Sequence, residues 1–80
     1  MNGMVEWISV SDSTRVVAVA YDAENETICV RFPNDVEWCY EACPPHVWED
    51  FMAPGVSKGK FIHDVLNHQT HHRYEQPPAS

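Results

Sequence analysis

The chain has 80 residues, of which 44% are hydrophobic, and it carries a formal net charge of −7 at pH 7. This length excludes a second domain, and the share of hydrophobic residues excludes a chain without a folded core. The acidic surplus excludes a general electrostatic attraction to nucleic acid or anionic lipid, so that any contact with phosphate must be local.

The cellular compartment is indicated by sequence features that the chain does not have. It has no apolar run long enough to cross a bilayer, and its first residues do not form a signal-peptide pattern. Its three cysteines, Cys29, Cys39 and Cys43, are an odd number without zinc-ribbon spacing, which suits reduced thiols. We therefore expect a cytoplasmic protein that does not bind a membrane.

Residues 1–9 open the chain as an N-terminal segment or short edge strand, with Trp7 and Ile8 as its anchors. Three runs with a period of two follow, at 16–22, 27–32 and 36–41, separated by residues typical of turns. This pattern predicts an antiparallel β-meander.

The turn lengths predict the register of these strands, because a slip of one residue would turn every apolar side chain to the wrong face. A four-residue loop at 23–26 and a three-residue loop at 33–35 produce one apolar face across all three strands, with small and charged side chains on the opposite face. The expected pairs are Tyr21 with Ile28, Val19 with Val30, Val17 with Phe32, Phe32 with Val36, Val30 with Trp38, Ile28 with Tyr40, Cys29 with Cys39 and Arg31 with Glu37.

Two helices are expected after the meander. Pro44 and Pro45 end the strands, and apolar residues at helical spacing predict a helix over 46–52. Ser57 is a candidate N-cap for a second helix over about 58–68, whose predicted apolar stripe is Phe61, Ile62, Val65 and Leu66. Residues 69–80 are polar and predict a tail without fixed structure.

The sequence thus predicts an α+β fold in which a three-stranded antiparallel meander, or four strands with the N-terminal edge, carries two helices on its apolar face. The domain is expected to span residues 10–68.

Several short segments, in order, resemble the KTSC domain family. They are Ser13 to Asp22, Thr27 to Phe32, Val36 to Tyr40, Cys43-Pro44-Pro45 and Ser57 to Phe61. The family pattern differs at Thr14, Ala20, Trp38 and Cys43, where it has Ser, Gly, Tyr and Val. The resemblance implies a small domain found at the C-terminus of some lysyl-tRNA synthetases and alone in bacteria and phages, with RNA binding suggested by that fusion. A phage-encoded member would work in the host cytoplasm.

The two lysines of the chain, Lys58 and Lys60, flank Gly59 directly after the candidate cap Ser57. A helix start presents backbone N–H groups and partial positive charge, and glycine lets a ligand approach the backbone. These residues are a candidate anion site, with Arg15 or Arg73 as helpers. The alternative is a plain capped helix start with solvated lysines.

Two further surfaces offer alternatives. Tyr21, Trp38 and Tyr40 could stack on bases, although the predicted register favours a place in the core. The opposite sheet face carries Arg31, Glu37 and Glu41, and it suits docking on a host protein better than on nucleic acid.

The remaining reactive residues do not form a convincing centre. His63, His68, His71 and His72 include metal-compatible spacings, but they fall late in the chain, and solvated imidazoles are the favoured interpretation. Cys43 near His46 lacks an orienting third group. Cys29 opposite Cys39 could cross-link if oxidised, although small buried thiols are favoured. We expect no metal, no cofactor and no enzymatic activity.

The sequence favours a small binding module for RNA, a nucleotide or another phosphate-bearing ligand. A protein-interaction module that uses the acidic sheet face is the alternative.

Overall fold

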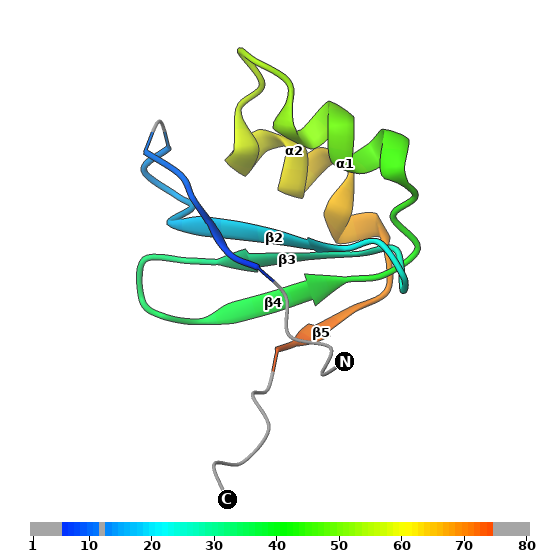
Figure 1. The fold of residues 1–80 in the computed structure, drawn as a ribbon. Coiled ribbons are helices and arrows are strands. Elements are labelled where there is room, and N and C mark those ends of the chain that lie inside the picture. The colour runs from blue at the N-terminus through cyan, green and yellow to red at the C-terminus, as the bar shows by residue number, and fades with distance from the viewer. Residues whose placement is uncertain (1–5, 12, 75–80) are drawn as a thin grey trace, which may run out of the picture.

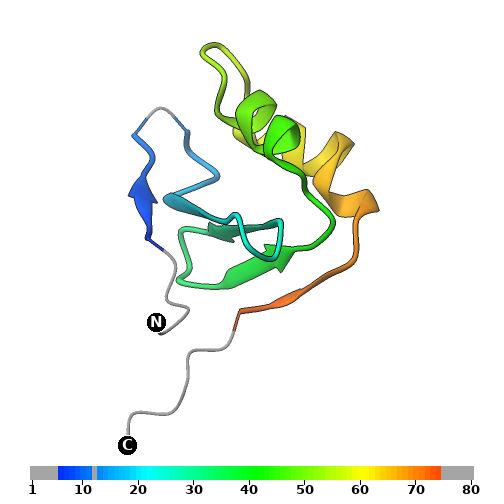
Figure 2. The ribbon, with the colours of Figure 1, turned by 45° about the vertical axis from the view of Figure 1, so that its right-hand side comes forward.

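The computed structural model describes residues 6–11 and 13–74. They form a single antiparallel sheet in the order β1-β2-β3-β4-β5, with the helices on one face of it (Figures 1 and 2). The strands are β1 (Ile8–Ser9), β2 (Ala18–Asp22), β3 (Thr27–Arg31), β4 (Glu37–Tyr40) and β5 (His71–Arg73); the helices are α1 (Pro45–Met52), α2 (Lys58–Asp64) and the 3₁₀ turn η1 (Leu66–His68). The predicted α+β class and the two helices on one face are confirmed.

The register within the central strands is the predicted one, except that Val17, which we expected opposite Phe32 on the apolar face, precedes β2 and is exposed. Tyr21 pairs with Ile28, Val30 pairs with both Val19 and Trp38, and Cys29 pairs with Cys39. The N-terminal edge strand also forms, because Ile8 pairs with Val19.

The fifth strand lies in the segment that we predicted to be an unstructured tail. His71, His72 and Arg73 are all exposed, so that β5 has no apolar alternation that a sequence pattern could reveal. Backbone bonds hold it instead, since the Glu41 N–H donates to Thr70 O at 2.7 Å and the Tyr74 N–H donates to Glu37 O at 2.8 Å. The rest of the predicted tail, 75–80, lies outside the described residues.

The main core lies between the sheet and the helices. The sheet contributes apolar side chains from β2, β3 and β4, and the helical segment contributes Phe51, Ile62 and Leu66, which are almost fully covered. Burial of this apolar surface is the main stabilising term for so small a domain.

The second helix is shorter than predicted. It ends at Asp64, and Val65 leaves helical geometry with φ −121° and ψ −58° before the chain tightens into η1. As a result Val65 is exposed while Leu66 is buried, and the prediction of Val65 in the buried stripe was wrong. Among the described residues, the helices are too short and too polar to span a bilayer.

Candidate anion-binding groove

A groove of about 700 Å³ forms where two segments more than forty residues apart in sequence meet. One is 13–15, before β2, and the other is 57–60, at the start of α2; His63 and Asp64 complete the lining. Ser13 shapes the first segment because its hydroxyl accepts the N–H groups of Arg15 and Val16, each at 3.2 Å. Val16 is buried in the core, and this anchor holds Arg15 at the groove.

Arg15 and Gly59 are in close contact. A Cβ atom added to Gly59 would lie 2.8 Å from Arg15 Cδ, closer than non-bonded carbon atoms pack. The glycine therefore leaves room for the arginine side chain across the helix start. Sequence analysis named both residues, and the structure brings them together.

The Ser57 cap is confirmed. Its side chain accepts the Lys60 N–H at 3.4 Å, and its carbonyl accepts the Phe61 N–H at 2.9 Å. This N-cap fixes where α2 begins and hence where Gly59 and Lys60 lie.

Lys58 does not extend into the groove as we had expected. Only 8% of the residue is exposed, and Nζ donates to the Phe51 carbonyl oxygen at 3.4 Å and lies 5.5 Å from the centre of the Phe51 ring. That carbonyl belongs to the last turn of α1, where carbonyl oxygens lack helical partners and attract cations. Lys58 thus ties the end of α1 to the start of α2.

Lys60 lies on the surface, with 75% of its side chain exposed and Nζ 2.7 Å from Asp64 Oδ2. The other oxygen of Asp64 lies 3.1 Å from His63 Nδ1. The bond to Asp64 raises the pKa of Lys60, and the bonds from Lys60 and then His63 lower the pKa of Asp64. A ligand anion at Lys60 would therefore compete with Asp64.

A second groove of about 350 Å³ adjoins the first and shares Arg15, Gly59 and His63 with it. Trp38 and His71 line this groove, with their rings 5.5 Å apart and edge to face. Of the other aromatic candidates, Tyr40 also lines this groove but is almost fully buried, and Tyr21 stacks on Trp48 at 5.1 Å. Arg73, the other proposed helper, pairs with Trp38 across β4 and β5 and does not line either groove.

On the opposite sheet face, the residues that we expected to dock on a partner already contact other side chains of the domain. Arg31 Nε bonds Glu37 Oε2 at 2.6 Å, and the Arg31 guanidinium lies 4.5 Å from the centre of the Trp7 ring. Trp7 and Tyr74 pack together over this face, with ring centres 6.0 Å apart. Glu41, the third residue of the docking hypothesis, lies 3.1 Å from His72.

Sequence analysis missed four groove residues: Ser13, Thr14, His63 and Asp64. Ser13 and Thr14 had one signal, since they precede Arg15 in a segment that carries the family resemblance, whereas His63 and Asp64 had none. In the described part of the chain, no three His, Cys, Asp or Glu side chains come together as a metal site would require.

Fold and groove together define a small α+β domain with an antiparallel sheet and helices on one face. The family model of the KTSC domain matches residues 12–69, and the chain belongs to this family. The crystal structure of a KTSC domain protein from Yersinia pestis is similar, with a TM-score of 0.79, 25% identity, and coverage of 90% of this chain and 100% of that one. A protein from Tsukamurella paurometabola is 27% identical over 55 residues, which are 69% of this chain and 81% of that protein.

Proposed function

We propose that this domain is a non-enzymatic binding module that recognises RNA, a nucleotide or another phosphate-bearing ligand in the groove between residues 13–15 and 57–60. The observation that carries the proposal is the contact of Arg15 with Gly59 beside Lys60. Arginine and lysine side chains from distant segments thus line one groove beside a glycine, in a protein whose net charge is −7.

The ligand would be held by charge-assisted hydrogen bonds. A guanidinium can donate two parallel bonds to one phosphate group, and an ammonium adds a point charge. Arg15 and Lys60 supply these groups. Lys58 holds the start of α2 in position through its bond to the Phe51 carbonyl oxygen. The ammonium group of Lys60 would leave the Asp64 carboxylate and bind the phosphate, because the carboxylate and the phosphate compete for it.

The adjoining groove favours a nucleotide over inorganic phosphate. Arg15 lines both grooves, and the second adds the rings of Trp38 and His71. Aromatic rings of this kind bind bases by stacking, at about 1–3 kcal/mol per base. A nucleotide could thus place its phosphate at Arg15 and its base near Trp38.

Docking on a host protein through Arg31, Glu37 and Glu41 is the weaker proposal. Arg31 and Glu37 already bond each other, and only 13% of the Glu37 side chain is exposed. Reversing the charges of Glu37 and Glu41 tests it, because a docked partner would then be lost.

The groove is tested by isothermal titration calorimetry with ATP, a short single-stranded RNA and inorganic phosphate. We expect Arg15→Ala and Lys60→Ala each to weaken ATP or RNA binding by about tenfold or more, because each variant loses charge-assisted hydrogen bonding to the phosphate. Arg73→Ala removes the same charge outside the groove and is the matched control. Binding that is absent, or that all three variants weaken equally, would contradict the proposal.

A further inference from the structure

Cys29 and Cys39 lie next to each other on the sheet face that points away from the helices. They are cross-strand partners in β3 and β4, and their Sγ atoms are 2.6 Å apart. His72 of β5 is the next partner in the same row, directly opposite Cys39. The row thus places two thiols and an imidazole side by side.

The backbone pattern brings the two cysteines especially close. Glu37 and Glu41 both direct their backbone bonds toward β5, and Cys39, midway between them, must do the same because bonding direction alternates along a strand. Cys29 and Cys39 are therefore a non-hydrogen-bonded pair, for which Cα atoms lie about 4.5 Å apart. Disulfide bonds span Cα distances of about 4.4–6.8 Å, so the strands need no rearrangement to be cross-linked.

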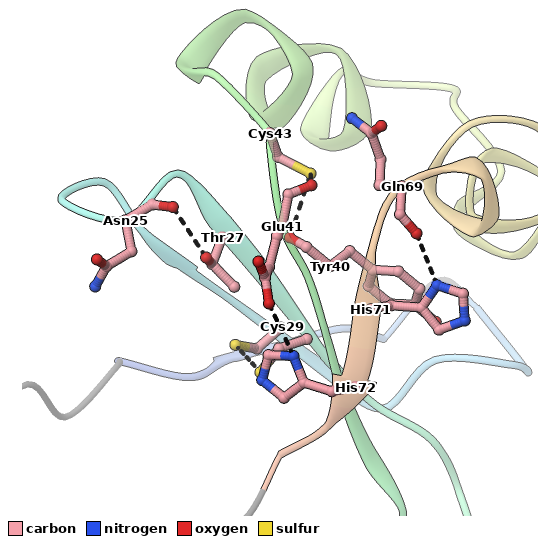
Figure 3. A network of polar contacts seen from close by, with 10 residues as sticks. Asn25, Thr27, Cys29, Tyr40, Glu41, Cys43, Gln69, His71 and His72 are labelled. Carbon is pink, nitrogen blue, oxygen red and sulfur yellow. Dashed lines mark hydrogen bonds and ion pairs between the residues drawn. The ribbon is translucent and has the colours of Figure 1, made fainter.

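The pair is covered, yet a groove reaches it. Trp7 and Tyr74 pack against the cluster of Ala20, Cys29 and Cys39, in which both thiols are almost fully buried. A groove of about 430 Å³ reaches both cysteines and is lined further by Thr27, Glu41, His72 and Tyr74. Figure 3 shows the Glu41 and His72 pair on the same side of the sheet as the Cys29 sulfur. The groove thus gives a small reagent a route to the two thiols.

The two thiols differ in acidity. The hydrogen bond with Cys29 lowers the pKa of Cys39, although burial and the carboxylates of Glu37, Asp22 and Glu41 oppose this shift. The same bond raises the pKa of Cys29. The close contact of the two sulfur atoms thus favours one thiolate beside one protonated thiol.

We propose that Cys29 and Cys39 are a redox-active dithiol, which hydrogen peroxide oxidises to a disulfide that joins β3 to β4. The Cys39 thiolate attacks one peroxide oxygen, the O–O bond breaks, and the departing hydroxide takes up the proton that Cys39 lost. Cys29 then attacks the sulfenic sulfur, the S–O bond breaks, and the Cys29 proton leaves with the hydroxide as a second water. Two thiols lose two electrons, and one peroxide becomes two waters.

Cys43 offers a built-in comparison. It is also fully buried, but its thiol contacts the carbonyl oxygens of Tyr40 and Glu41, each at 3.4 Å, and burial raises its pKa. It packs in the core on the helix side of the sheet. It should remain a free thiol under conditions that oxidise the other two.

The test treats the reduced full chain with hydrogen peroxide, blocks free thiols with iodoacetamide under denaturing conditions and measures the intact mass. The expected product has lost two hydrogen atoms and carries one blocked thiol, and peptide mapping locates the link between Cys29 and Cys39. Dithiothreitol should restore three thiols. Cys43→Ala should still form the link, and Cys29→Ala should not.

Two results would overturn the proposal without relying on a variant that folds. One is three free thiols in the wild-type chain at a peroxide dose that oxidises a cysteine-containing reference peptide. The other is a map that shows Cys43 in the link, or sulfinic acid on Cys39 with no link at all.

Discussion

At the scale of single residues, the two described glycines of the helical region have opposite reasons to be glycine. A Cβ atom on Gly59 would require the Arg15 side chain to shift, whereas Gly55 has open space around it but a φ of 83°. Gly59 allows the close contact with Arg15, and Gly55 allows a backbone conformation that L-residues rarely adopt.

We expect Gly59→Ala to weaken ATP or RNA binding without unfolding the domain. The new methyl group displaces Arg15 from the groove, while alanine gains up to about 1 kcal/mol of helix propensity over glycine. The free energy of unfolding should therefore change by less than about 1 kcal/mol. Calorimetric titration gives the affinity, and urea unfolding gives the stability.

Gly55→Ala is the matched control, with the reverse outcome. The left-handed backbone should cost about 1–2 kcal/mol of stability and leave ligand affinity unchanged, because Gly55 does not line either groove. Equal effects of the two substitutions on binding would mean that the contact of Arg15 with Gly59 is not part of the site.

Asp64→Asn should strengthen the binding of a phosphate-bearing ligand several-fold. The substitution removes a carboxylate from the groove and releases Lys60 from its closest partner. Asp50→Asn, a neutralisation on α1 outside both grooves, controls for the change in net charge. Weaker binding by Asp64→Asn would indicate that the carboxylate itself contacts the ligand.

Residue-level prediction succeeded where a local rule applied and failed where a partner was distant. Ser57 was identified as a cap because the capping residue and its helix are adjacent in sequence. The inward direction of Lys58 depends on a carbonyl in another helix, and a sequence pattern does not show which carbonyl lies within its reach. Whether the groove binds an anion is a prediction that the proposed titrations test.

At the scale of elements, the central hairpins were predictable in register and the N-terminal edge strand was expected, while β5 was not. Apolar alternation and loop length specify one pairing of β2, β3 and β4. In contrast, β5 is held by backbone bonds to β4 and carries three exposed polar side chains. Its pairing depends on the position that η1 gives to the chain, which is a tertiary effect.

Removal of β5 should make the buried thiols reactive. A chain that ends at Thr70 lacks β5 and Tyr74, which covers Cys29 and Cys39. We expect a faster reaction of these cysteines with a thiol reagent and a lower melting temperature. The comparison is a chain that ends at Tyr74, and equal thiol reactivity of the two chains would mean that β5 does not protect the pair.

At the scale of the whole molecule, several weak acids in the fold favour their protonated forms. Burial is the largest cause of the raised pKa of Tyr21, Tyr40 and Cys43, with acidic neighbours such as Glu26 adding to it for Tyr21 and Cys43. Folding thus retains protons that the unfolded chain releases at lower pH. Stability is complete below the ordinary pKa values of these groups and falls as pH rises through the values of the folded state.

We therefore expect the melting temperature to stay level near neutral pH and to fall above about pH 9. Thermal unfolding between pH 7 and pH 11, with tyrosinate absorbance as a second signal, checks this. Tyr40→Phe removes one of the ionising groups and should reduce the slope of the decline. A melting temperature that rises above pH 9 would contradict the argument.

The contact of Trp7 with Tyr74 makes the domain suitable for circular permutation. The two side chains lie near opposite ends of the described sequence, yet their ring centres are 6.0 Å apart, so these two parts of the chain lie near each other. A short peptide could join the region of Trp7 to that of Tyr74, and new ends could be opened in the turn between α1 and α2 around Gly55. The same proximity would let the domain be inserted into a surface loop of another protein with little separation of the loop ends.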